Sequence, residues 1–176
     1  MELRQICGKK SLKLLFLLFT SLLIGVVSAT IYSNMFIQGS GTITSSSGLS
    51  WQLGTNAPSG AHVEGYTVTG LNLSIPQNTF QNFTDCLELK NNDATSHTFG
   101  LQTTLTGGAT TNFATFNLVV YTNTGAQITK INILSGGSPS GLTIEGSQTL
   151  YIRFEVAPVT NATSGYMAFT VELTYQ

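Results

Sequence analysis

Few side chains in this sequence are of the types that do chemistry, and their spacing does not bring them together. Cys86 lies eleven residues before His97. His62 stands upstream of both, and Met167 is far downstream. A copper site in a β-sandwich gathers its cysteine, histidine and methionine ligands closely around one loop. The spacing therefore argues against copper, the metal that this set of residue types suits best.

Carboxylates and serines form no recognisable catalytic arrangement either. Asp85, Glu88 and Asp93 are the closest acids. A calcium loop needs several carboxylates within about a dozen residues, and Glu88 is expected to face solvent on a strand. No serine lies in a G-x-S-x-G sequence. A carboxylate pair for glycoside hydrolysis stays open, since it depends on positions in space. We expect no catalytic residue, no metal ligand and no cofactor, and hence no enzyme.

Aromatic side chains point to binding instead of catalysis. A sugar ring could stack on Trp51, Tyr66, Tyr121 or Tyr151. Tyr151 is the best single indication, because two-residue alternation puts it on the outer face of its strand. Outward tyrosines are also common on strands for their β-propensity alone. A secreted or membrane-anchored carbohydrate-binding or adhesion domain is therefore an alternative function.

Three N-x-S/T sequons mark possible N-glycosylation sites at Asn72, Asn82 and Asn161. Asn161 lies in a Ser/Thr-rich turn and Asn82 between expected strands, where a glycan could project. Asn72 falls inside an apolar strand and is the doubtful one. A chain this rich in asparagine, serine and threonine produces such sequons by chance, so only their positions carry weight.

The first residues have the organisation of a secretory signal. A basic segment is followed by the apolar run 14–27 and by a small-residue cleavage sequence ending at Ala29, so the expected mature chain begins at Thr30. With cleavage, the protein meets the membrane only during export. Two alternatives stay open. One is an uncleaved anchor, because 14–37 has no charge and is long enough to span. The other is a type IV prepilin, whose helix would have to continue through the glycine- and serine-rich residues 39–48.

The expected mature chain carries little charge. Its three basic and seven acidic side chains give a formal charge of about −4. Charged residues make up 9 % of the whole chain, against roughly 25 % in an average protein. No basic surface is available to neutralise nucleic acid, and a nearly neutral surface permits identical copies to pack side by side. Once Cys7 is removed, Cys86 is the one cysteine left, and burial is favoured over a bond to another chain.

Two-residue alternation of apolar and polar residues runs through 49–176 and predicts strands throughout. The alternation is clearest in 147–158 and 165–176, and turn sequences rich in Gly, Asn and Ser separate the strands. Seven to nine short strands of this kind predict one all-β domain, an antiparallel β-sandwich of the Ig-like or jelly-roll-like type. The residues expected to face its core in the clearest strands are Phe99, Leu101, Thr103, Leu105, Phe116, Leu118, Val120, Leu150, Ile152, Phe154, Val156, Met167, Phe169, Val171, Leu173 and Tyr175.

The segment "IYSNMFI", residues 31–37, is apolar on both faces. We expect 30–48 to consist of this strand and a Gly/Ser/Thr linker, 39–48, that can reach about 30 Å. The strand either folds back into its own sandwich or inserts into a neighbouring subunit by β-strand addition. Insertion would link copies head-to-tail, and contacts of this kind generate a filament because they do not close.

This organisation resembles secreted filament proteins of the TasA/camelysin type, and it is closest in style to archaeal bundling pili and thread filament subunits. The resemblance rests on the signal sequence, on "TIYSNMFIQGSGTI" and on the strand-only body. "GLTIEGSQTLYIRFEVAP", residues 141–158, is similar to the late strands of that family. The low charge and small size depart from the family's biofilm-matrix members.

The resemblance implies sandwich subunits that are joined by N-terminal donor strands, often glycosylated and assembled without a cofactor. The corresponding donor-strand residues here are Ile31, Tyr32, Met35, Phe36 and Ile37. We therefore expect 1–29 to be a signal peptide and the rest to form an extracellular, cell-surface homopolymer whose filaments could bundle laterally. A component of a surface layer or of a virion is a weaker alternative.

Overall fold

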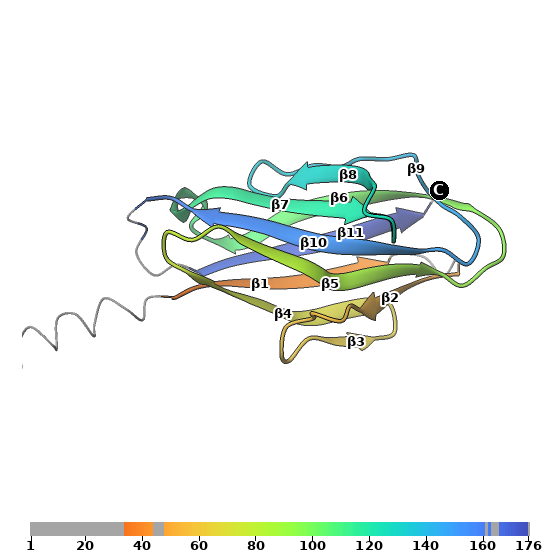
Figure 1. Cartoon of the computed structure of the whole chain (residues 1–176), viewed down its shortest axis with the longest axis horizontal. Coiled ribbons are helices and arrows are strands. Elements are labelled where there is room, and N and C mark those ends of the chain that lie inside the picture. The colour runs from red at the N-terminus through yellow and green to blue at the C-terminus, as the bar shows by residue number, and fades with distance from the viewer. Residues whose placement is uncertain (1–33, 44–47, 161, 163–165, 176) are drawn as a thin grey trace, which may run out of the picture. The chain divides into compact units, whose positions relative to one another are not determined.

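The computed structural model describes residues 34–43, 48–160, 162 and 166–175, all of which belong to one compact unit, 34–176. The expected signal peptide, its cleavage point at Ala29 and Thr30, and Ile31, Tyr32 and Asn161 lie outside the described residues. Within them the protein is all-β, and two sheets pack face to face as a sandwich (Figure 1). The predicted fold class is confirmed.

The six-stranded sheet has the order β3-β4-β1-β11-β6-β9. Its strands are β3 (His62–Glu64), β4 (Thr67–Pro76), β1 (Asn34–Ile43), β11 (Tyr166–Tyr175), β6 (His97–Gly108) and β9 (Leu142–Ile144). The five-stranded sheet has the order β2-β5-β10-β7-β8. Its strands are β2 (Leu49–Leu53), β5 (Gln81–Asn91), β10 (Thr149–Pro158), β7 (Phe113–Tyr121) and β8 (Gln127–Asn132). A short 3-10 helix, Thr110–Asn112, precedes β7.

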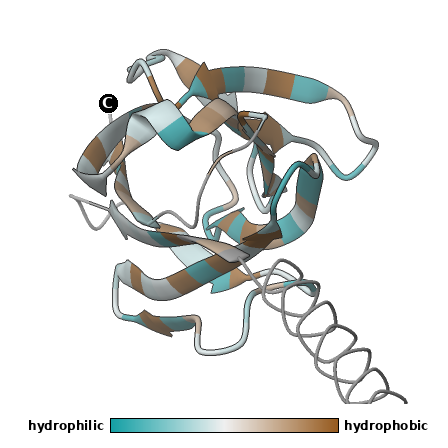
Figure 2. Cartoon of the chain, turned by 90° about the vertical axis from the view of Figure 1, so that its left-hand side faces the viewer, coloured by the Kyte–Doolittle hydropathy of each residue, from teal (hydrophilic) through white to brown (hydrophobic). Residues whose placement is uncertain are grey.

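Alternation places the apolar side chains of both sheets between them. Along β10 and β11 the inward residues are buried and their neighbours are partly exposed, as the sequence pattern predicts. Figure 2 shows hydrophobic and more polar residues alternating along strands of the sandwich. Three phenylalanines occupy the centre of the core. The ring centroid of Phe169 lies 5.0 Å from that of Phe116 and 5.4 Å from that of Phe154. Edge-on contacts at these distances are favourable for aromatic rings, so this cluster fixes how the sheets face each other.

The described residues form eleven strands, more than the seven to nine expected. Two of them, β3 and β4, follow each other closely and are separated only by a turn with Gly65 at φ 59°. Strands β3 and β9 have three residues each, which is too short for alternation to be seen in a sequence. The extra strands are therefore short pieces at the edges of the six-stranded sheet.

The largest departure from expectation concerns residues 39–43, which the sequence places in the linker. In the structure β1 continues through them to Ile43. Their Gly-Ser-Gly composition is typical of a linker, but glycine is also tolerated in a strand where a neighbouring side chain fills the space. The segment left to join β1 to β2 is 44–48.

Candidate functional site

Strand β1 lies in the interior of the six-stranded sheet and pairs with a strand on each side. It is antiparallel to β4, from Asn34 opposite Pro76 to Thr42 opposite Thr67. It is parallel to β11, from Phe36 opposite Tyr166 onward. All other strand pairs among the described residues are antiparallel. Without β1, both β4 and β11 would present unpaired backbone edges.

The core-facing side of β1 has two large side chains followed by two glycines. Met35 and Ile37 are 0 % and 1 % exposed. Burying two such side chains contributes about 3–6 kcal/mol before ordering costs. Gly39 and Gly41 are also buried. The structure does not describe the side chain of Phe36.

The two glycines are matched to aromatic side chains of other strands. Gly39 lies opposite Phe169 in the parallel pair. A Cβ at Gly39 would be 2.3 Å from the Cζ atom of Phe169, so the ring occupies the place where a side chain would be. A Cβ at Gly41 would lie 3.6 Å from the ring of Trp51, an ordinary contact. Shifting β1 by two residues so that Ile37 replaced Gly39 would put a large side chain under the Phe169 ring, so this match excludes that register.

The connection from β1 to the five-stranded sheet is short and anchored at its far end. The backbone N–H and the side-chain Nδ2 of Asn92 each donate a hydrogen bond of 2.9 Å to the carbonyl oxygen of Gly48. Gly48 has φ 75°, and an added Cβ there would meet the Asp93 carboxylate. From Ile43 to Gly48 the chain can reach roughly 17 Å, and packed sheets lie about 10 Å apart.

A second group of side chains lies on the outer face of the five-stranded sheet. The rings of Tyr121 on β7 and Tyr151 on β10 stand opposite each other, with centroids 5.7 Å apart. The guanidinium carbon of Arg153 lies 5.6 Å from the Tyr121 centroid. The backbone N–H of Asp85 on β5 donates a 3.2 Å hydrogen bond to the Tyr121 hydroxyl. Because β10 lies between β7 and β5, the Tyr121 ring crosses β10 and is held at both ends.

Asp85 lies in a bulge of β5. Ile152 and Phe154 on β10 pair with Leu87 and Phe83, so three residues of β5 face one of β10. Asp85 has φ 54°, a conformation that aspartate tolerates better than most residues. Bulges of this kind redirect a side chain from one face of a sheet to the other.

The bulge turns the Asp85 carboxylate toward a shallow hollow. Its Oδ2 atom accepts hydrogen bonds from the backbone N–H of Thr55, at 3.2 Å, and from the Thr55 hydroxyl. Its Oδ1 atom is buried without a donor. Side chains from β5, from β7 and the turn after it, and from β10 line the hollow, which has a volume of about 240 Å³. They are Asp85, Tyr121, Asn123 and Tyr151.

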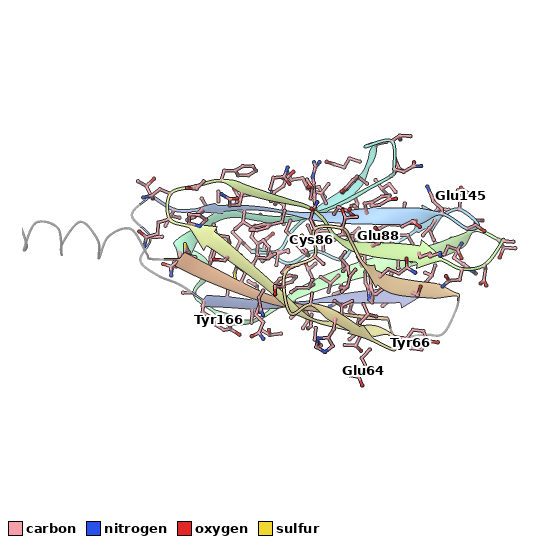
Figure 3. All side chains as sticks on the ribbon, turned by 60° about the horizontal axis from the view of Figure 1, so that its bottom comes forward. Glu64, Tyr66, Cys86, Glu88, Glu145 and Tyr166 are labelled. Carbon is pink, nitrogen blue, oxygen red and sulfur yellow. The ribbon has the colours of Figure 1, made fainter. Side chains whose placement is uncertain are left out.

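Glu88 lies beside this bulge and is affected by it. Burial, and then the charge and hydrogen bonding of the Asp85 carboxylate, raise the pKa of Glu88 above its usual value. Cys86 lies close by (Figure 3). It is fully buried, and burial, followed by the Asp85 charge, raises the pKa of its thiol to about 12. The expected burial of Cys86 is confirmed, and the raised pKa leaves very little of the thiol ionised at neutral pH.

A charged cluster continues along the same face. Glu155 accepts a 2.7 Å hydrogen bond from Lys130 and lies 3.1 Å from a guanidinium nitrogen of Arg153. The hydrogen bond from Lys130 is the main reason why the pKa of Glu155 lies below its usual value. Val119, which the alternation puts on this outer face, is 0 % exposed and pairs with Arg153 and Lys130 on its two sides. The charged side chains therefore cover an apolar one.

The four aromatic residues proposed from the sequence have different positions. Tyr121 and Tyr151 lie together, as described above. Trp51 is only 2 % exposed, so it cannot stack on a sugar, and that prediction is wrong. Trp51 faces inward because alternation on β2 puts it, with Leu49, on the core side. Tyr66 is 47 % exposed in the β3–β4 turn and stands well apart from Glu88 (Figure 3).

The sequons that the structure describes are accessible. Asn72 is exposed on β4 and Asn82 is exposed near the start of β5. Asn72 is accessible although it belongs to an apolar strand, because the apolar residues of β4 face the core and Asn72 faces outward.

Sequence reasoning missed the contributions of Asp85 and Asn123 to the hollow. One signal was present for Asp85. Alternation from Phe83 through Leu87 to Leu89 would point Asp85 into the core, and an acid in that register indicates a bulge. Nothing local marks Asn123, which comes close to Asp85 only through the order of strands in the sheet.

In the described ranges no three residues of the types His, Cys, Asp and Glu come together as a metal site. His97 Nε2 lies 2.7 Å from an Asp93 carboxylate oxygen, and His62 lies on β3. None of the residues that the structure describes belongs to a helix long and apolar enough to cross a membrane. No protein-family model matches the chain, and no curated protein sequence matches it significantly.

Proposed function

We propose that this protein is the structural subunit of an extracellular filament, in which each subunit donates strand β1 to the six-stranded sheet of the next. The observation that carries the proposal is the position of β1. It is the first described strand, and it completes the middle of a sheet by pairing with β4 and, in parallel, with β11. With the expected cleavage after Ala29, β1 would be joined to the rest of the protein only through 44–48.

Exchange would conserve every contact that β1 makes in the closed monomer. Met35 and Ile37 would enter the core of the neighbour, and Gly39 would lie beneath the neighbour's Phe169. Such swapping of a terminal element is a low-cost route to assembly. Each subunit would receive one strand and donate another, so the contacts run head-to-tail and do not close. The product is a homopolymer.

The outer faces of β1, β6 and β11 favour lateral contacts between filaments. Most of their outward residues are Gln, Ser, Thr and Ala; Tyr166 is an exposed aromatic residue on this face, and Glu172 is the only charged one among those that the structure describes. Weak repulsion between copies permits close packing. Exposed Asn72 on the neighbouring β4 would limit such packing if it carried a glycan.

The test is a cross-link between β1 and β4 that distinguishes one chain from two. Thr42 on β1 is paired with Thr67 on β4, and paired residues on neighbouring strands are within the Cα distance that a disulfide spans. One chain carries Thr42→Cys and another carries Thr67→Cys, and the two are expressed together. Cys86 does not compete, because it is buried and the pKa of its thiol is raised to about 12.

We expect oxidation to produce a disulfide-linked dimer on a non-reducing gel, because only exchange of β1 brings the two cysteines together. The control pairs Thr42→Cys with Gln102→Cys. Gln102 lies in the same row on β6, but β11 separates it from β1. Two strand spacings are about 9.5 Å, beyond the reach of a disulfide. Dimers at equal yield in both mixtures, or none in the first, would contradict the proposal.

A further inference from the structure

We propose that the hollow between Asp85, Tyr121, Asn123 and Tyr151 binds a saccharide, with one sugar ring against the tyrosines and a hydroxyl group hydrogen-bonded to Asn123. The site lies on the outer face of the five-stranded sheet, and β1 belongs to the other sheet. The inference therefore does not depend on strand exchange, and either proposal can fail without the other.

The two tyrosines form the part of the site that recognises a ring. Their centroids are 5.7 Å apart and their planes are inclined by 31°, and both rings line the hollow, where together they form what we call the platform. The C–H groups on one side of a pyranose carry partial positive charge, and they pack on the negative face of an aromatic ring. The hydroxyl groups at the rim of the same sugar need polar partners. Asp85 and Asn123 lie at the edge of the platform.

The platform is held in place before any ligand arrives. The Asp85 N–H fixes the Tyr121 hydroxyl, and Arg153 lies over the Tyr121 ring. Thr55 in turn holds one oxygen of the Asp85 carboxylate. The other oxygen is buried, so Asp85 holds the platform in place and the exposed amide of Asn123 is the polar group that a sugar hydroxyl can reach. A preformed site loses less side-chain entropy on binding, which favours a small ligand.

The same features argue against other classes of ligand. Carboxylates at Asp85 and Glu88 disfavour phosphate groups and nucleic acid. An organic cation would be repelled by the guanidinium charge of Arg153, which lies over the Tyr121 ring. The volume of about 240 Å³ is below the usual range for drug-sized ligands, about 300–1,000 Å³, so it suits a single sugar ring. A neutral saccharide fits best. If the protein polymerises, the repeated sites would bind glycan chains with an avidity well above the single-site affinity.

Saturation-transfer difference NMR on the native full chain tests this inference. The probes are the methyl glycosides of glucose, galactose, mannose and N-acetylglucosamine, each added separately. Weak binding is sufficient for this method, and large assemblies do not prevent it. We expect transfer to the ring protons of at least one probe, strongest on one face of the sugar. The dissociation constant then follows from a titration of that probe.

Three variants locate the binding. Tyr151→Thr removes one ring but keeps a good strand former, and we expect it to weaken binding by about tenfold, which corresponds to roughly 1.4 kcal/mol. Asn123→Ala changes an exposed turn residue and should weaken binding without affecting the fold. The control, Tyr66→Thr, removes an exposed tyrosine far from the hollow. If Tyr151→Thr fails to fold, the effect of Asn123→Ala still shows whether the sugar binds in the hollow.

The result that supports the inference is transfer that both hollow variants reduce and that the control leaves unchanged. Absence of transfer from all four probes would overturn it. So would transfer that survives Asn123→Ala and Tyr151→Thr, or that Tyr66→Thr reduces equally. None of these outcomes affects the cross-linking result, since Thr42 and Thr67 lie in the other sheet.

Discussion

The fit between Gly39 and Phe169 predicts that a single methyl group on β1 destabilises the fold. In Gly39→Ala the added Cβ would lie 2.3 Å from Phe169 Cζ, whereas carbon atoms in contact are about 3.5–4.0 Å apart. The ring or the strand must therefore move by more than about 1 Å. The ring has little room, because Phe116 and Phe154 pack against it at 5.0 Å and 5.4 Å.

The expected loss of stability follows from two opposing effects. Overpacking a core costs about 1–3 kcal/mol. Replacing glycine by alanine lowers the conformational entropy of the unfolded chain, which stabilises the folded state by about 0.4–1 kcal/mol. We expect Gly39→Ala to lower the free energy of unfolding by about 1–2 kcal/mol. In urea, with an m-value of about 2 kcal/mol/M, the midpoint would fall by about 0.5–1 M.

Gly41→Ala is the matched control, because it lies on the same face of β1 only two residues away. Its added Cβ would be 3.6 Å from Trp51, so no atom needs to move. We expect it to be neutral or slightly stabilising. Phe169→Leu removes the outer ring atoms and should relieve the clash. The double variant with Gly39→Ala should be more stable than additivity predicts, by about 0.5–3 kcal/mol.

Equal effects of the two glycine substitutions, measured by urea unfolding, would refute the reasoning, because they would show that Phe169 does not fill the space above Gly39. Strict additivity in the double variant would have the same meaning. If β1 is exchanged between subunits, Gly39→Ala should also lower the yield of filaments, which electron microscopy of the extracellular fraction would measure.

Three further predictions concern buried or paired polar groups. Asn91→Ala should lower the free energy of unfolding, measured in urea, by about 2–3 kcal/mol. The buried Asn91 amide donates to two backbone carbonyls at 2.8 Å and 2.9 Å and accepts a hydrogen bond from one backbone N–H. An unchanged urea midpoint would mean that water replaces the Asn91 amide without cost. Glu155→Gln should cost less than about 1 kcal/mol at neutral pH. The pKa of Glu155 is lowered in the folded protein, so the stability that its carboxylate contributes is present above the usual pKa and is lost as the pH falls through the lowered pKa. A difference in stability between Glu155→Gln and wild type that persists in acid would contradict this pH dependence. Cys86 should resist iodoacetamide in the native protein and react in denaturant, as mass spectrometry would show, and rapid native labelling would disprove its burial.

The parts of the fold that the sequence predicts are those with a strong local signal. Strands β10 and β11 alternate over ten residues each, and every core-facing residue expected in β10 is buried. Their pairing partners could not be predicted in the same way. β11 pairs with β1, far away in the chain, and no local pattern encodes that contact.

The misassigned segment shows why composition alone is insufficient. Residues 39–43 look like a linker because their side chains are small or absent. Their place in a strand depends on the Phe169 and Trp51 rings, which come from β11 and β2 and fill the space above the two glycines. The hollow is similar, since Tyr121 and Tyr151 are neighbours only because β7 pairs with β10.

The closed monomer and the proposed filament differ little in their contacts. Met35, Ile37 and the backbone pairs of β1 would be buried equally when β1 fills its own sheet or a neighbour's. Their free energies therefore differ mainly by the conformation of 44–47 and by the entropy of association, about 4–15 kcal/mol. In the proposed filament, residues 44–47 act as the hinge between β1 and Gly48. The length of this hinge must then determine whether the filament or the closed monomer is favoured, since short hinge loops favour swapping. If β1 is exchanged, residues 44–47 connect the donated strand to Gly48, which Asn92 holds in the body of the sandwich. Lengthening them by a flexible insertion should favour closed monomers over filaments, while leaving the contacts of β1 unchanged.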